Sequence, residues 1–190
     1  MWLAPPLLLT AGLGISQPDD NDSFSLRPEP ELFVDGRVGY PVDKNVSVGL
    51  RLRGSHTNIR WADSVAPRPY DQFNDTFELY TLDVGAFVEL DSRYFNVMGW
   101  LGAHNARVHA IYNHYTDDNS ATFREQEHFF TGPARAGGLA LGVHIYTADN
   151  YRVTLFGEAA VSSNVFMTNK SLESDSYTYK PLSVGVAVRF

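Results

Sequence analysis

From Leu32 to the end of the chain, apolar and polar residues alternate with a period of two in one segment after another. The C-terminal segment shows this most clearly, because its alternate positions are all apolar: Leu182, Val184, Val186, Val188 and Phe190. A period of two is that of an extended strand with one apolar face, whereas an amphipathic helix has a period of about 3.6 residues. The chain is therefore predicted to be all-β.

The alternation recurs in seven segments, at about 32–40, 46–61, 77–90, 94–112, 126–146, 151–165 and 176–190. These lengths are near the roughly ten residues that a tilted strand needs to cross a bilayer. The most apolar stretch, residues 1–16, is shorter than the roughly 18 residues of a membrane helix and contains Pro5 and Pro6. A helical membrane protein is thereby excluded.

Three features favour a membrane barrel over a soluble one. The polar faces combine small residues with isolated charges, and the chain has only three lysines, which does not suit a face exposed to water. The connections alternate between short ones at 41–45, 91–93 and 148–150 and long polar ones at 62–76, 113–128 and 165–175, as in outer-membrane barrels. Aromatic residues gather at strand ends, where membrane barrels carry their girdles: Tyr40, Trp61, Tyr80, Tyr94, Tyr112, Tyr146, Tyr151, Tyr179 and Phe190.

These features predict one domain, residues 1–190, folded as a closed antiparallel transmembrane β-barrel in the bacterial outer membrane. Such a barrel needs an even number of strands when both ends lie on the periplasmic side, and eight is the nearest even number. Residues 1–16 are expected to form the missing first strand, with 17–31 as a polar outer loop; alternatively, residues 1–16 are the remnant of a signal peptide. A soluble barrel is the competing fold, and it predicts that Val184, Val186 and Val188 point inward.

Isolated charges on the polar faces are expected to point into the barrel. The interior of an eight-stranded barrel is only wide enough for side chains, so these charges would pair across the lumen and fill it. Charges near the rims would instead be hydrated, and their pairs would contribute less than about 1 kcal/mol. The set consists of Asp35, Arg37, Arg51, Arg53, Asp83, Glu89, Arg152, Glu158 and Arg189.

The end of the chain carries a separate signal. A terminal aromatic residue that follows alternating apolar residues resembles the sorting signal read by the outer-membrane assembly machinery. In this sequence the signal is Phe190 with Val184, Val186 and Val188. The assembly machinery is therefore an expected partner, together with outer-membrane lipid and lipopolysaccharide.

Composition removes several classes of activity. The absence of cysteine excludes disulfides, zinc–thiolate sites and cysteine nucleophiles, and a net charge of −7 argues against nucleic acid as a partner. The six histidines are scattered, although His104 or His144 shares the inner face with Glu158 and Ser162. An interior imidazole paired with a carboxylate is more often structural than catalytic, so no catalytic residue and no cofactor is assigned. The acidic outer loops, with pairs such as Asp117-Asp118, carry oxygen ligands suited to divalent cations.

Three segments resemble the family of the Legionella-type major outer-membrane protein: Phe77–Tyr112, Phe130–Ser163 with its Leu-Phe-Gly-x-Ala-Ala run, and Pro181–Phe190. The resemblance covers about half of the chain and implies an outer-membrane barrel. The chain is shorter than the family pattern and lacks its cysteines, so the pore role of larger relatives is not carried over. The expected function is structural, surface-adhesive or narrow-pore, without catalysis; a lipid-modifying enzyme and a soluble ligand-binding barrel are the alternatives.

Overall fold

The computed structural model describes residues 7–18, 26–61, 76–115, 122–131, 133–167 and 175–190. Its elements are all strands: β1 (Leu8–Pro18), β2 (Leu26–Pro28), β3 (Glu31–Asp43), β4 (Val46–Trp61), β5 (Thr76–Asp91), β6 (Phe95–Tyr115), β7 (Thr122–Thr131), β8 (Ala134–Thr147), β9 (Arg152–Met167), β10 (Asp175–Tyr179) and β11 (Pro181–Arg189). Within these residues there is no helix of the length and apolarity that a membrane crossing requires.

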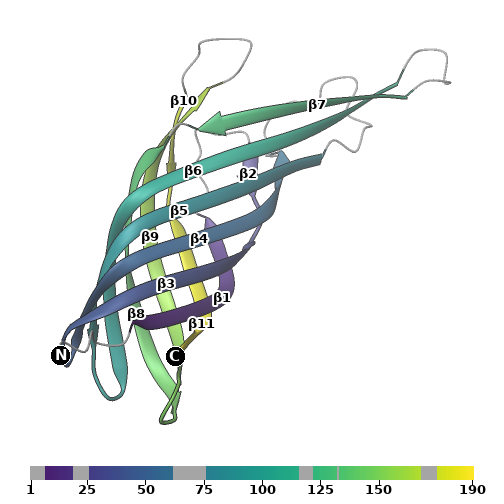
Figure 1. Cartoon of the computed structure of the whole chain (residues 1–190). Coiled ribbons are helices and arrows are strands. Elements are labelled where there is room, and N and C mark those ends of the chain that lie inside the picture. Colours follow the sequence, from purple (N-terminus) through teal and green to yellow (C-terminus); the bar gives the residue numbers. More distant parts are fainter. Residues whose placement is uncertain (1–6, 19–25, 62–75, 116–121, 132, 168–174) are drawn as a thin grey trace.

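The strands close into a ring (Figure 1). Its order is β1–β3–β4–β5–β6–β8–β9–β11, and β11 returns to β1 through antiparallel pairs that run from Thr10↔Arg189 to Pro18↔Pro181. The short or outlying strands β2, β7 and β10 extend the upper end of this ring by pairing with β4, β6 and β9. The predicted fold class, a closed antiparallel β-barrel of eight strands, is confirmed.

The N-terminal segment forms part of the ring. Leu8–Pro18 is strand β1, which pairs with β3 on one side and β11 on the other, while residues 1–6 lie outside the described part of the chain. The predicted polar loop over 17–31 is wrong at both ends, because Gln17 and Pro18 still pair with β11 and Glu31 already begins β3. The side chain of Glu31 is buried in the lumen, so this acid belongs to the barrel interior and not to a solvated loop.

Two predicted strands are each divided in the structure. The segment predicted at 126–146 is divided into β7 and β8 next to Pro133, and the segment predicted at 176–190 is divided into β10 and β11 next to Pro181. Proline has no N–H to donate to a sheet ladder, so it interrupts strand pairing. Strands β6 and β9 also run further than predicted, to Tyr115 and Met167.

The predicted tight turns lie together at the lower end of the barrel, near the end of β11 (Figure 1). They connect β3 to β4 at 44–45, β5 to β6 at 92–94, and β8 to β9 at 148–151. A backbone hydrogen bond from Ser92 N to Phe95 O, 2.9 Å long, closes the second, and one from Ala148 N to Tyr151 O, also 2.9 Å, closes the third. Residues 19–25, 62–75, 116–121 and 168–174, which carry most of the predicted outer loops, lie outside the described part of the chain.

Side chains alternate between the lumen and the outer face along every strand of the ring. In β3, for example, Phe33, Asp35 and Arg37 are buried while Leu32, Val34 and Val38 are exposed. The inward aromatic rings lie over inward glycines of the neighbouring strand. A Cβ atom on Gly49 would lie 2.8 Å from Cε1 of Phe87, and one on Gly14 would lie 2.6 Å from Cζ of Phe33. Glycine at these positions therefore makes the room that the rings fill.

Candidate functional site: the filled lumen and the apolar outer face

Arg51 of β4 lies at the centre of the lumen and has no exposed side-chain surface. Its Nε donates to Oδ1 of Asp35 at 2.6 Å, and its two Nη atoms donate to Oε1 and Oε2 of Glu158 at 2.8 and 2.7 Å. Asp35 lies on the adjacent strand β3, whereas Glu158 lies on β9, four strands away around the ring of eight. The bidentate Arg51–Glu158 pair therefore spans the lumen from one wall to the other.

Further side chains complete this central layer. Trp100 Nε1 donates to Oε1 of Glu158 at 3.0 Å, and Arg53 Nη1 lies 3.4 Å from the same oxygen. Arg37 Nε donates to Oδ2 of Asp35 at 2.6 Å. The three guanidinium groups also lie over aromatic rings, with the carbon of Arg53 only 3.8 Å from the ring centre of Phe33. Three arginines thus share two carboxylates and three rings, which compensates the cost of burying their charge.

A second layer lies at the lower end, where Arg189 is held by two acids of β5. One of its Nη atoms donates to Glu89 and the other to Oδ2 of Asp91 at 2.9 Å. The same Oδ2 accepts from Arg152 Nη1 at 2.6 Å, and Oδ1 of Asp91 lies 2.8 Å from Nε2 of His144. Arg152 and Asp91 are partly exposed, so this layer lies at the rim of the barrel. This agrees with the alternative prediction that some of the charges lie near the rims and are hydrated.

A third layer lies towards the upper end; sequence reasoning placed its Asp83 and His104 on the inner face but missed Glu31 and Tyr179. The hydroxyl of Tyr179 donates to Glu31, and Ser55 Oγ donates to the other carboxylate oxygen of Glu31 at 2.6 Å. Asp83 contacts Nδ1 of His104 at 2.5 Å, and the His104 ring stacks on Tyr179 with centroids 5.1 Å apart. The predicted girdle position of Tyr179 is therefore wrong. Its even spacing from Pro181 and Ser183, which are both buried, is the signal that places it on the inner face.

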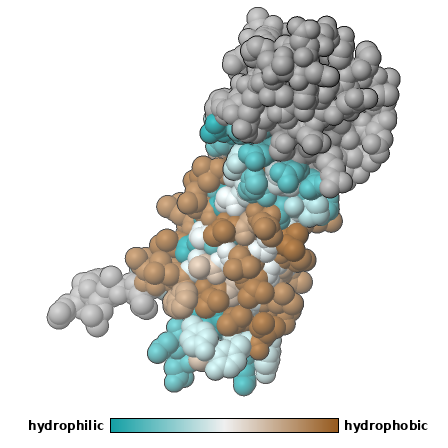
Figure 2. Space-filling model, turned by 90° about the vertical axis from the view of Figure 1, so that its right-hand side faces the viewer, coloured by the Kyte–Doolittle hydropathy of each residue, from teal (hydrophilic) through white to brown (hydrophobic). Residues whose placement is uncertain are grey.

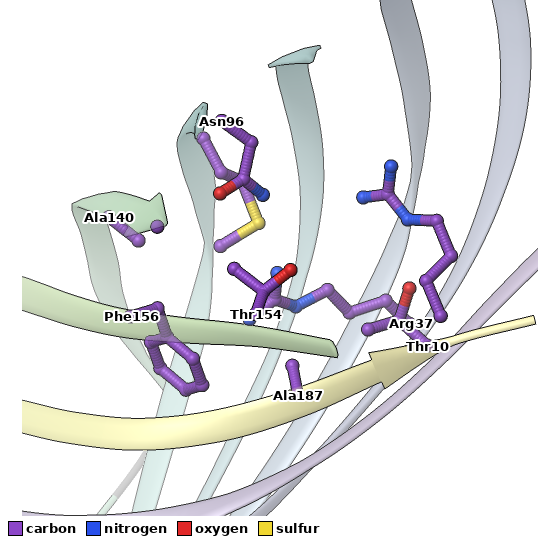
Figure 3. Close-up of a pocket in the computed structure, with 10 residues that line it drawn as sticks. Thr10, Arg37, Asn96, Ala140, Thr154, Phe156 and Ala187 are labelled. Carbon is purple, nitrogen blue, oxygen red and sulfur yellow. The ribbon is translucent and has the colours of Figure 1, made fainter. Parts of the chain in front are cut away.

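Between the central and lower layers lies a cavity of about 10 Å³ (Figure 3). Figure 3 shows Arg37 of β3, Asn96 of β6, and Thr154 and Phe156 of β9 around it. Oδ1 of Asn96 is buried without a hydrogen-bond partner in the described part of the chain, whereas Nη2 of Arg37 lies 2.5 Å from Oδ2 of Asp35. A volume of this size accommodates about one water molecule, which would satisfy the Asn96 oxygen.

The predicted interior residues thus lie in three layers. Arg51, Arg53 and Glu158 meet at the centre, Glu89, Arg152 and Arg189 meet at the lower rim, and Asp83 faces His104 instead of an arginine. Neither histidine that shares the inner face with Glu158 and Ser162 contacts that acid: His104 contacts Asp83, His144 contacts Asp91 and Thr154, and Glu158 is paired with Arg51. No group of three potential metal ligands is found among the described residues, and Asp117-Asp118 lies outside them.

The outer face of the barrel is an apolar belt between polar ends (Figure 2). Leu101 is 76% exposed and Leu32 is 69% exposed, values that a water-soluble protein avoids over so large an area. Val184 and Phe190 are also exposed, at 63% and 64%, and Val186 faces the same way. The inward orientation of the valines that a soluble barrel requires is therefore not observed. Exposed aromatic residues surround the lower end of the belt: Tyr40, Tyr94, Phe95, Tyr146, Tyr151 and Phe190.

Several solved structures with a similar arrangement are those of outer-membrane proteins. Ail, the attachment invasion locus protein of Yersinia pestis, superposes with a TM-score of 0.50 at 16% identity over 97% of both chains. The chain has the fold of an outer-membrane β-barrel. Neisserial surface protein A gives a TM-score of 0.50 at 12% identity over 96% of this chain and 95% of that one. OprG of Pseudomonas aeruginosa gives 0.53 at 9% identity over 97% and 95%.

No family model and no curated protein sequence matches the chain. The resemblance to the Legionella-type family is accordingly supported only at the level of the general class, small outer-membrane barrels. Identities of 9–16% establish a shared fold and carry no residue-level correspondence.

Proposed function

We propose that the chain is a non-catalytic protein of the bacterial outer membrane, with a structural and surface-presenting role and a lumen closed to solutes. The observation that carries this proposal is the Arg51–Glu158 pair, because it joins opposite walls at the centre of the barrel. The rings of Trp100 and Phe33 cover the remaining guanidinium surface. Of the roles expected from the sequence, a filled lumen favours structure and adhesion over permeation.

The outer face supports the proposed location and partners. An apolar belt with aromatic residues at its lower edge is suited to membrane lipid and, in the outer leaflet, to lipopolysaccharide. The exposed side chain of Phe190 is accessible to an assembly machinery that reads a terminal aromatic residue. The acidic loops are proposed to share divalent cations with lipid phosphates. Membership of the Legionella-type family is likewise proposed.

Planar bilayers test the closed lumen. The full chain is refolded in detergent, inserted into the bilayer and recorded under voltage, with protein-free bilayers as the control. We expect no conductance above that of the control, since ion pairs and rings fill the lumen. Insertion is verified by the heat-dependent gel mobility of the recovered protein. Reproducible single-channel steps from protein of verified mobility would establish a pore and overturn this role.

Fractionation tests the location independently of the lumen. We expect the chain in the outer-membrane fraction of expressing cells, and folding to a β-rich spectrum only in the presence of detergent or lipid. A monomer that folds in plain buffer would contradict the membrane assignment.

A lipid-modifying enzyme is the second candidate, and the Asp83–His104 contact in the upper layer is the observation that favours it. An imidazole held by a carboxylate is the usual arrangement of a general base. Mass analysis of lipid A from cells with and without the chain separates the two functions. Unchanged acyl chains would dismiss the enzyme.

A further inference from the structure

The apolar belt is hollowed where β5, β6, β8 and β9 lie side by side. A groove of about 900 Å³ opens there on the outer face. Its floor consists of small outward-facing residues, among them Ala86, Gly99 and Gly137, and its sides include Leu101 and Leu139. The register places Gly99 opposite Leu139 and Gly137 opposite Leu101, so each leucine rises beside a glycine. The groove is therefore formed by the barrel wall itself, through the pairing of small and large outward side chains.

A second depression continues the groove towards β11. It has a volume of about 600 Å³, shares Leu139 and Ala159 with the first, and reaches Leu182 and Val184 across Gly157. On the opposite side of the barrel, exposed leucines, isoleucine and valines occupy most outward positions of β1, β3 and β4: Leu13, Ile15, Leu32, Val34, Val38, Leu50 and Leu52. Two adjoining depressions on one side offer room for more than one hydrocarbon chain.

One charged residue lines this otherwise apolar groove. Arg135 of β8 is exposed, and its guanidinium has no hydrogen bond or ion pair with any residue that the structure describes. It pairs with Ala103 at the level where the outward positions of β6 change from apolar Leu101 to polar Asn105. Arg135 therefore lies at the upper boundary of the belt, which is the outer-leaflet boundary if the proposed location holds.

A cation at the polar end of an apolar groove is complementary to a lipid with an anionic headgroup. Guanidinium groups bind phosphate by paired, charge-assisted hydrogen bonds. In the groove below Arg135, the acyl chains of a bound lipid contact a fixed protein surface instead of neighbouring lipids. A zwitterionic lipid places a second, positive charge at the same height, which Arg135 repels. The charge and the hydrocarbon room together select a phosphorylated lipid with several acyl chains.

We propose that this groove binds a phosphorylated, multiply acylated glycolipid of the lipid A type, with Arg135 on a phosphate and the acyl chains along Gly99, Gly137 and Ala159. This inference rests on the proposed outer-membrane location and adds a specific lipid site to it. The binding is one-sided: the face formed by β5, β6, β8 and β9 retains the lipid, and the face formed by β1, β3 and β4 does not.

Native mass spectrometry of the refolded full chain in detergent micelles tests the site, with lipid A as the probe and phosphatidylcholine as the reference lipid. We expect a one-to-one lipid A adduct that survives detergent removal. In Arg135→Gln the affinity for lipid A should fall by about tenfold, while the weak binding of phosphatidylcholine should not change. The matched control is Arg93→Gln, which removes an exposed arginine from the lower turn beside Tyr94 and should leave lipid A binding unchanged.

A second pair of variants tests the groove apart from the charge. A Cβ on Gly99 would meet Cδ2 of Leu139 at 3.5 Å, an ordinary contact, so the backbone admits a side chain there and Gly99→Leu is expected to occupy the groove. Gly36 of β3 is equally open, with its nearest contact at 3.9 Å, and Gly36→Leu is the control on the opposite face. We expect Gly99→Leu to lose the lipid A adduct and Gly36→Leu to keep it.

Several results would overturn the site. Equal binding by Arg135→Gln and the unmodified chain would do so, as would equal losses in Arg135→Gln and Arg93→Gln, which indicate unspecific charge attraction. Conversion of a dimer into a monomer by Gly99→Leu would identify the groove as an interface between copies. Every variant is first checked for heat-dependent gel mobility, which shows that it is folded. If the unmodified chain folds in detergent but binds no lipid A, the lipid site is wrong and the membrane assignment stands. If the unmodified chain does not fold in detergent, the membrane assignment itself is contradicted.

Discussion

Phe87 covers Gly49 of the neighbouring strand, and the same pairing of an inward ring with an inward glycine recurs around the lumen: Phe33 with Gly14, Phe156 with Gly185, and Trp100 with Gly138. Each pair lies directly opposite in the register. The ring occupies the volume that the glycine leaves free, so the lumen is packed although its wall is rich in small residues.

Gly49→Ala is expected to destabilise the barrel by about 1–3 kcal/mol, because the added methyl group would overlap Val38 O and lie 2.8 Å from Cε1 of Phe87, and overpacking of this kind costs that amount. The measurement is urea unfolding of the chain in lipid vesicles, followed by gel mobility. Gly54→Ala is the control, since Gly54 faces outward and its nearest contact would be 3.9 Å away. Equal unfolding midpoints for the two variants would contradict the packing role of Gly49.

Strands β1 and β11 close the ring, and the backbone N–H of Phe190 adds one more bond at its lower end by donating to Leu9 O at 2.9 Å. The side chain of Phe190 itself faces outward and is exposed. Its backbone therefore contributes to closure, while its ring is free for recognition before the barrel is complete.

Deleting Phe190, or replacing it with Asp, is expected to lower insertion into the outer membrane several-fold and to expose the chain to periplasmic proteolysis. The physical reason is that the assembly machinery no longer recognises the end of the chain. This loss of recognition is expected to lower insertion more than the loss of one apolar contact with lipid does. Val153→Ala, on the outward face of β9, should cost about 1 kcal/mol or less where lipid fills the gap. Protease treatment of intact cells measures both. Surface levels of the Phe190 deletion equal to those of the unmodified chain would remove the sorting role.

The strands were predictable because alternation reports which residues share a face. The tight turns follow from it directly, whereas alternation gave only seven strands and the eighth was inferred from the even number that a barrel with both ends on one side needs. Alternation says nothing about height along the barrel or about which strands lie opposite, so the partners of Arg51 and Asp83 could not be assigned. Glu31 was assigned to an acidic loop and Tyr179 to an aromatic girdle at a strand end. Each lies an even number of positions from an inward residue, Phe33 and Ser183 respectively, and this spacing would have placed both on the inner face.

On the scale of the whole molecule, the barrel is apolar outside and ionic inside. Asp35 and Glu158 form ion pairs with the three central arginines, and the side chains of both acids have no exposed surface. Charges in such a place are stabilising only as a complete set, since removal of one partner leaves the other buried and unpaired.

Glu158→Gln is expected to lower the free energy of unfolding by about 3–5 kcal/mol, because Arg51 loses its charged bidentate partner at a site where neither side chain has exposed surface. The control is Glu78→Gln, near the upper end of β5, where the carboxylate accepts a hydrogen bond from the exposed Tyr80; there the loss should be below about 1 kcal/mol. Urea titration in vesicles at one salt concentration compares the two. A Glu158→Gln variant as stable as Glu78→Gln would mean that the lumen is hydrated.

The Arg51–Glu158 bond joins residues that are 107 positions apart in the chain. Contacts of such separation form late in folding, because the intervening chain must be ordered first. Until β11 meets β1, the lumen is an open trough in which these charges keep their water. Closure of the ring and dehydration of the central arginines are therefore the same event, which makes the final step of assembly cooperative and leaves a half-closed barrel with no stable interior of its own.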